Sequence, residues 1–134
     1  MHVKLMRASL LLVAVATFFL AANITAAQEN ASPKKRLRSP ATARGFIGGE
    51  SNDGYVIRAR RGQVMTVRIS WRHVDDNRAE FSVSDSAEFG GQVEFGKLTY
   101  SGRRWRGKIP QTGNYYVYVV AHPSAHYTLK VTLR

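Results

Sequence analysis

Apolar and polar residues alternate most clearly over residues 64–71 (VMTVRISW). Successive side chains of an extended strand point to opposite faces, so this pattern predicts a strand with one buried face and one exposed face. The residues expected to point inward are Met65, Val67, Ile69 and Trp71.

The same alternation recurs in six further segments, which turn residues separate: 55–59, 80–83, 93–100, 104–109, 114–121 and 126–133. We expect residues 55–59 to form an antiparallel hairpin with residues 64–71, because Gly62 in the connection can take the positive φ of a tight turn. About seven or eight short strands with no helical pattern predict an all-β fold, an antiparallel β-sandwich of the jelly-roll type. A closed barrel is the alternative.

The first 27 residues have the pattern of a secretory signal peptide. Lys4 and Arg7 precede an uncharged run over residues 8–22, and the small residues Ala26 and Ala27 follow it. The run is shorter than the roughly 20 apolar residues of a spanning helix, although an uncleaved anchor is the alternative. We therefore expect residues 1–27 to be removed, and no transmembrane segment in the mature chain.

Residues 28–42 are polar and basic and contain Pro33 and Pro40. We expect a flexible arm here, either a solvated leader or a segment that binds phosphate or lipid headgroups, followed by the sandwich domain at residues 43–134. The full sequence has 20 Lys and Arg against 9 Asp and Glu, and the signal peptide holds only two of the basic residues, Lys4 and Arg7. This excess of positive charge predicts an acidic partner.

The chain of 134 residues contains no cysteine. Small exported domains of eukaryotes are usually held together by disulfides, so a bacterial protein, periplasmic or secreted, fits this composition better.

Residues that carry catalysis do not form a recognisable motif. The serines lack a G-x-S-x-G turn, and no thiol is present. His122 and His126 are four residues apart, but Pro123 prevents the helix that a zinc pair of this spacing needs, so a surface metal site is the minor alternative. Asp75 and Asp76 lack the spacing of a calcium loop, which favours a polar turn. We expect no enzyme, no metal and no cofactor.

Aromatic and basic residues that share an outward face suggest nucleic-acid binding as one hypothesis. Tyr116 and Tyr118 point outward on their predicted strand, and Arg58, Arg68 and Arg72 point outward on others. Such a surface can stack bases and pair with phosphates, but the export signal argues against it, and we expect no nucleic acid. Tyr116 and Tyr118 stay as candidate contacts for a partner, with cross-strand packing as the alternative.

The segment 100–105 (YSGRRW) places two arginines and a serine at a strand junction. Guanidinium groups can pair bidentately with the carboxylates of an acidic cleft, which makes Ser101, Arg103 and Arg104 candidate partner contacts. His122, in the short connection before the last strand, is a further candidate. The alternative is a hairpin whose arginines are merely solvated.

Four segments carry a resemblance to a known family: 55–70, 105–110 (WRGKIP), 113–119 (GNYYVYV) and 127–131 (YTLKV). Over about residues 44–133, the chain resembles the bacterial pre-peptidase C-terminal (PPC) type of β-sandwich. Within that group, the order of the motifs looks most like that of the periplasmic inhibitors of goose-type lysozyme. The resemblance implies a periplasmic protein that enters the active-site cleft of a lysozyme with a loop and so protects peptidoglycan.

Two functional hypotheses follow. The first is a lysozyme inhibitor that acts by protein contact. The second is an exported PPC-like module that binds an anionic component of the cell envelope, such as peptidoglycan, teichoic acid or lipid phosphate. Neither hypothesis specifies an oligomeric state.

Overall fold

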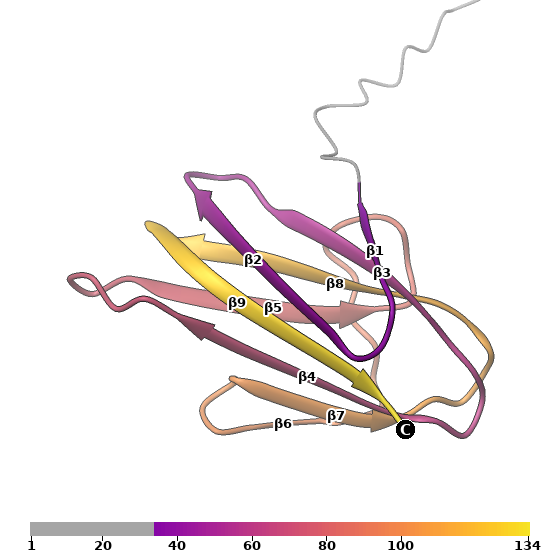
Figure 1. Ribbon diagram of the computed structural model, residues 1–134. Helices are drawn as coiled ribbons and strands as arrows, with labels where there is room; N and C mark the ends of the chain where they lie inside the picture. Colours follow the sequence, from indigo (N-terminus) through magenta and orange to yellow (C-terminus); the bar gives the residue numbers. More distant parts are fainter. Residues whose placement is uncertain (1–33) are drawn as a thin grey trace, which may run out of the picture.

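The computed structural model describes residues 34–134, which form two stacked β-sheets (Figure 1). One sheet has four strands in the order β1–β3–β8–β5, and the other has five in the order β2–β9–β4–β7–β6. The strands are β1 Lys35–Leu37, β2 Ala41–Gly48, β3 Asp53–Ala59, β4 Val64–Trp71, β5 Arg78–Ser84, β6 Lys97–Thr99, β7 Arg104–Lys108, β8 Gly113–His122 and β9 Ser124–Leu133. Neighbours pair antiparallel, except β1 and β3. The predicted all-β sandwich is confirmed, with nine strands in the described residues in place of seven or eight.

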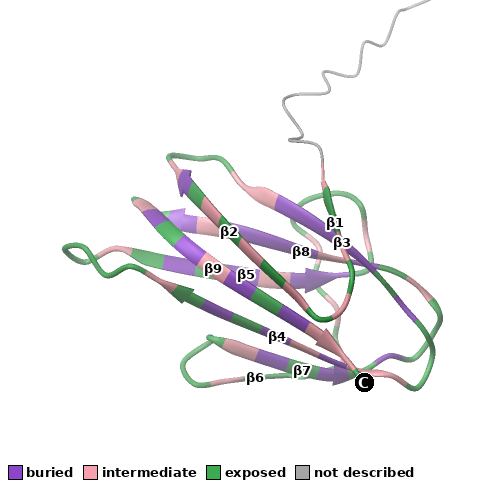
Figure 2. Ribbon diagram, viewed as in Figure 1, coloured by how far each residue is buried: buried purple, intermediate pink, exposed green. Residues whose placement is uncertain are grey.

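The core lies between the two sheets, and the period of two along the strands builds it (Figure 2). In β4, Met65, Val67 and Ile69 are buried and Arg68 and Ser70 are exposed, as predicted. Residues 34–134 contain no helix with the length and hydrophobicity of a membrane span.

Trp105 on β7 is buried, and two glycines leave the space that its ring fills. A Cβ atom on Gly96 would lie 2.3 Å from the ring, and one on Gly107 would lie 2.6 Å from it. Any larger residue at either position would therefore displace the ring or the backbone.

A polar cluster inside the core joins the sheets. The hydroxyl oxygens of Tyr55 on β3 and Tyr127 on β9 lie 2.5 Å apart, and the Tyr127 hydroxyl also donates a hydrogen bond to Asp53. Burial raises the pKa of Tyr127, and its hydrogen bonds with Asp53 and Tyr55 raise it further. Burial also raises the pKa of Tyr55, a change that the hydrogen bond with Tyr127 partly offsets. Both hydroxyls are held in the neutral form.

The predicted hairpin between residues 55–59 and 64–71 is wrong. The strand β3 belongs to the four-stranded sheet and pairs with β1 and β8, whereas β4 pairs with β7 and β9 in the other sheet. The connection over residues 60–63 crosses from one sheet to the other. Four residues are enough for this crossing, because two stacked sheets lie only about 10 Å apart.

The sandwich also begins earlier than predicted. Residues 35–37 form β1 against β3, and Ala41 and Thr42 belong to β2, so residues 34–42 are part of the domain and not a flexible arm. The predicted signal peptide, and residues 28–33 of the arm, lie outside the described residues.

In each sheet, a strand from the first part of the described chain lies beside one of the last two strands. β2 pairs with β9 from Ala41 opposite Val131 to Gly48 opposite Ser124, and β3 pairs with β8 in the other sheet. Each sheet therefore joins an early strand to a late one.

Candidate functional site

The β6–β7 turn carries three consecutive residues with positive φ: Tyr100 at 53°, Ser101 at 56° and Gly102 at 80°. Residues other than glycine seldom adopt this conformation, and such backbone strain tends to occur at functional sites. The amide of Arg103 donates to the carbonyl of Tyr100 at 3.2 Å, and the Arg103 carbonyl accepts from the amide of Ile69 at 2.9 Å. The turn is thus closed on itself and anchored to β4.

Arg103 projects from this turn onto an aromatic ring at the end of β4. Its guanidinium carbon lies 4.5 Å from the ring centroid of Trp71, and the imidazole of His73 lies 5.0 Å from the same ring. Arg103 is exposed and Trp71 is half-buried. Stacking on an aromatic face restricts the guanidinium group while leaving its N–H donors free for a partner.

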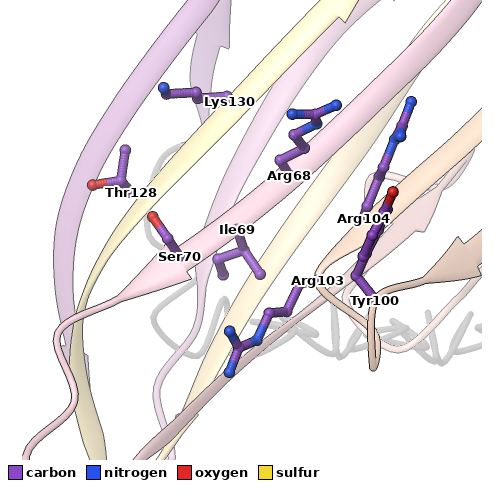
Figure 3. A pocket seen from close by; sticks show the side chains of 8 residues that line it. All are labelled: Arg68, Ile69, Ser70, Tyr100, Arg103, Arg104, Thr128 and Lys130. Atoms are coloured by element: carbon purple, nitrogen blue, oxygen red, sulfur yellow. The ribbon is translucent and has the colours of Figure 1, made fainter.

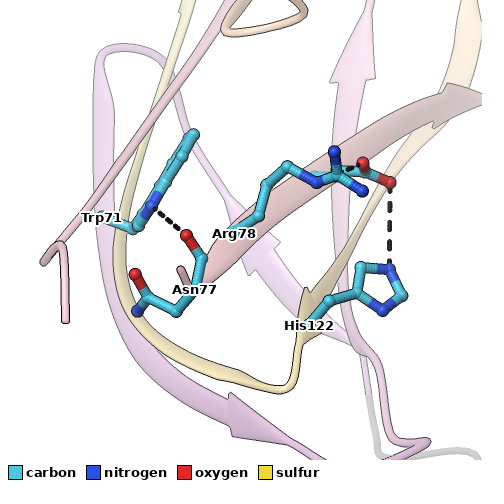
Figure 4. Close-up of polar contacts among 5 residues, drawn as sticks. Trp71, Asn77, Arg78 and His122 are labelled. Atoms are coloured by element: carbon cyan, nitrogen blue, oxygen red, sulfur yellow. Dashed lines mark hydrogen bonds and ion pairs between the residues drawn. The ribbon is translucent and has the colours of Figure 1, made fainter. Parts of the chain in front are cut away.

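The β4–β5 loop holds Trp71 in place through Asn77. The indole Nε1 donates to the Asn77 carbonyl at 3.2 Å (Figure 4). The side chain of Asn77 accepts from the amide of Val74 at 3.0 Å and donates to the carbonyls of Arg72 and Ser124 at 2.9 and 3.2 Å. Asn77 therefore ties the loop to the start of β9.

Across residues 34–134, no three His, Cys, Asp or Glu side chains gather closely enough to hold a metal ion. The two histidines of the minor zinc alternative are on different sheets, His122 on β8 and His126 on β9. His126 packs against Phe46, with ring centroids 4.6 Å apart and the rings tilted by 43°.

Arg104 is the first residue of β7 and points to the outer face of the five-stranded sheet. Its guanidinium carbon lies 6.0 Å from the ring centroid of Tyr100. The two residues help to line a shallow pocket of about 350 Å³ together with Arg68, Ser70, Arg103 and Lys130 (Figure 3). The pocket has no acidic side chain in its lining, so it suits an anionic group.

His122 lies at the same end of the sandwich as the β6–β7 turn, but on the other sheet (Figure 1). Its Nε2 atom is 4.0 Å from a carboxylate oxygen of Glu80, whose other oxygen is 3.0 Å from Nε of Arg78. All three side chains are exposed, so these ion pairs contribute little to stability. His122 and the predicted arginines thus share an end of the molecule without forming one cluster.

Tyr118 was predicted to be exposed, but the structure buries it. Its side chain is on the outer face of the four-stranded sheet, but it is only 2% exposed. Phe89 packs edge-on against the ring at 5.6 Å, and the hydroxyl donates to the carbonyl of Ser86 at 2.9 Å. Tyr116 stacks on Tyr118 at 6.3 Å and is half-buried, with Lys34 Nζ at 5.9 Å from both rings. The alternative interpretation, packing, describes this pair better.

Trp71 and Tyr100 are the residues that the sequence prediction missed at this site. The period of two placed Trp71 in the core, but β4 ends there and the ring is half-buried at the end of the sheet. Tyr100 is 70% exposed, and its position next to the Ser-Gly turn was the available signal. We call Trp71, Tyr100 and Arg103 the loop-end cluster.

Solved structures with the same fold include two lysozyme inhibitors. PliG of Aeromonas hydrophila, a periplasmic inhibitor of g-type lysozyme, matches with a TM-score of 0.60 and 24% identity, over 75% of this chain and 96% of its own. PliG of Salmonella Typhimurium matches with a TM-score of 0.54 and 19% identity, over 75% and 98%. This chain has the PliG fold. The pre-peptidase C-terminal domain of a Bacillus anthracis collagenase shares it, with a TM-score of 0.55, 17% identity and coverage of 74% and 94%.

The resemblance inferred from the four sequence segments is therefore confirmed in the fold, since both PliG and a PPC domain are structural neighbours. No protein-family model matches the chain, and no curated protein matches it in sequence.

Proposed function

We propose that this chain is exported and inhibits a g-type lysozyme by direct contact, with the loop-end cluster as part of the contact surface. The observation that carries the proposal is the fold, which the PliG inhibitors share over almost their whole length. Export is supported by the signal-peptide pattern of residues 1–27 and by the periplasmic location named for PliG.

The loop-end cluster has the chemistry for such a contact. Glycoside hydrolases generally use a pair of carboxylates in their cleft, and a guanidinium group can pair with a carboxylate through two hydrogen bonds. Arg103 is already held against Trp71, so less side-chain entropy is lost when it binds. Trp, Tyr and Arg are also the residue types that most often dominate the energy of protein interfaces.

Long-range charge does not drive this association. The chain is strongly basic, and many lysozymes are basic as well, so the two molecules repel each other at a distance. The contact must then depend on short-range pairing in the cleft, and we expect moderate salt, which screens the long-range repulsion, not to weaken inhibition.

A lysis assay tests the proposal. Protein recovered after export, with its N-terminus read by mass spectrometry, is added to goose-type, chicken-type and invertebrate-type lysozymes, and clearing of a cell-wall suspension is followed. We expect slower clearing by the goose-type enzyme. Arg103→Ala should raise the concentration for half-inhibition at least about tenfold, as for an arginine at the centre of an interface.

The matched control is Arg61→Ala. Arg61 is exposed in the β3–β4 connection, at the opposite end of the sandwich, so this variant removes the same charge away from the site (Figure 1). Arg103→Lys keeps the charge but loses the planar stack on Trp71, and it should fall between Arg103→Ala and the unaltered protein. If no lysozyme is slowed at a molar excess of protein, the proposed inhibition is wrong.

A further inference from the structure

The outer face of the five-stranded sheet carries positive charge only. Its five strands contain no Asp or Glu, but they carry seven basic residues: Arg44 on β2, Arg68 on β4, Lys97 on β6, Arg104, Arg106 and Lys108 on β7, and Lys130 on β9. Within residues 34–134, none of these side chains forms an ion pair. We call these seven residues the basic face.

Strand register places three of these charges in one row. Lys130 lies opposite Arg68, and Arg68 lies opposite Arg104, on three neighbouring strands. Strands are about 4.8 Å apart, and like charges directly opposite each other destabilise a sheet. Arg106 continues the array along β7, two residues from Arg104. A bound anion would therefore reduce the repulsion between these cations.

The row borders a pocket of about 370 Å³ whose basic lining suits an anion. Arg68, Arg104, Arg106, Lys130 and Arg134 line it together with two threonines. The Nε atom of Arg104 is buried and has no hydrogen-bond partner in the described part of the chain, so one donor is unused. Several guanidinium groups with nearby hydroxyls are a set that suits phosphate oxygens.

The face also carries exposed aromatic rings at its loop end. Phe46 on β2 is 59% exposed and Tyr100 is 70% exposed. Phe46 packs against His126, which belongs to the outward row of β9, and Tyr100 borders the pocket that Arg68 also lines. Aromatic side chains are favoured at the headgroup level of membranes, next to phosphates that attract Lys and Arg.

We propose that the basic face binds the phosphate groups of an anionic phospholipid bilayer. The charges extend in two dimensions, across the strands and along β7, which matches a flat layer of headgroups better than a single linear polymer. The exposed rings of Phe46 and Tyr100, next to the two edge strands β2 and β6, enter the interface at the loop end of the sheet. This site adjoins the proposed lysozyme contact and shares Tyr100 with it, but its charges are those of the basic face.

Co-sedimentation with vesicles tests this proposal. The exported protein is mixed, near physiological ionic strength, with vesicles of phosphatidylcholine alone or with about a third phosphatidylglycerol. We expect binding to the anionic vesicles only. The combined variant Arg68→Gln, Arg106→Gln and Lys130→Gln should weaken this binding roughly 100-fold, since each basic residue near an anionic surface contributes about fivefold.

The matched control is the combined variant Arg58→Gln, Arg60→Gln and Arg61→Gln, which removes the same charge from exposed positions outside the basic face. It should lose far less binding, and neither variant should have a lower thermal midpoint than the unaltered protein. Phe46→Ser should weaken vesicle binding severalfold. Equal losses in the two charge variants, or binding to neutral vesicles, would overturn the proposal. Tighter binding of single-stranded DNA than of anionic vesicles would show that a linear polymer is the occupant, and this too would overturn it.

Discussion

Trp105 shows at the scale of single residues how one side chain constrains its neighbours. Gly107→Ala should lower the free energy of unfolding by about 1–3 kcal/mol, because the new Cβ would lie 2.6 Å from the Trp105 ring and 3.0 Å from the Cα atom of Gly96. Urea denaturation measures the change.

Gly113→Ala is the control for that substitution, since a Cβ at Gly113 has no neighbour within 4 Å. It should change the unfolding free energy by less than about 0.5 kcal/mol. Equal changes in unfolding free energy at Gly107 and Gly113 would show that the Trp105 ring can move aside at little energetic cost.

The residues that could be predicted from the sequence are those whose environment is set by their own strand. Met65, Val67 and Trp105 are buried as the period of two predicts. Tyr118 was misplaced because a loop without periodicity covers it, through Phe89 and Ser86. Burial by a loop that is distant in sequence cannot be predicted from the alternation of residues within the strand itself.

The β4–β5 loop is an element whose shape depends on one side chain. Asn77→Ala removes the acceptor for Val74 and the donors to Arg72 and Ser124, so the unfolding free energy should fall by about 1–3 kcal/mol. Half-inhibition of lysozyme should also need more protein, because Trp71 is held by the same loop.

Asn114→Ala removes an exposed amide from β8 and is the comparison for that variant. Its unfolding free energy and inhibition should match those of the unaltered protein. A loss in Asn77→Ala no larger than in Asn114→Ala would mean that the loop is held by its backbone alone.

Strand positions were more predictable than strand partners. Segments 64–71, 104–109, 114–121 and 126–133 all contain strands close to the expected bounds. The pairing of β3 with β4 was wrong because a four-residue turn is compatible both with a hairpin and with a crossing between stacked sheets. The candidate site was also predicted without knowledge of strand partners. Arg103 directly precedes β7 and His122 ends β8, and these two strands belong to different sheets.

At the scale of the whole molecule, the buried tyrosines make the free energy of unfolding depend on pH in the alkaline range. Folding raises the pKa of Tyr127, Tyr55 and Tyr118, chiefly by burial, so the native state keeps protons that the unfolded chain releases above about pH 10. The unfolding free energy should therefore be steady at neutral pH and fall as the pH rises beyond that value. Urea denaturation between neutral pH and pH 11 measures the slope.

Tyr127→Phe should make that alkaline slope shallower by up to about 1.4 kcal/mol per pH unit, the contribution of one proton. It should also lower stability at neutral pH, because Asp53 and Tyr55 each lose a hydrogen-bond partner. Tyr100→Phe, which removes an exposed hydroxyl, is the comparison. An unchanged slope in Tyr127→Phe would mean that this phenol does not oppose ionisation.

The pairing of β2 with β9 and of β3 with β8 also sets the order in which the protein can acquire its structure. Ala41 meets Val131 only when nearly the whole domain has been synthesised, and contacts between residues so distant in sequence form slowly. Neither sheet can be completed while the last two strands are still on the ribosome. For a chain that carries a signal peptide, as we propose, this delay favours export before folding, and the two sheets would then form after the chain has crossed the membrane.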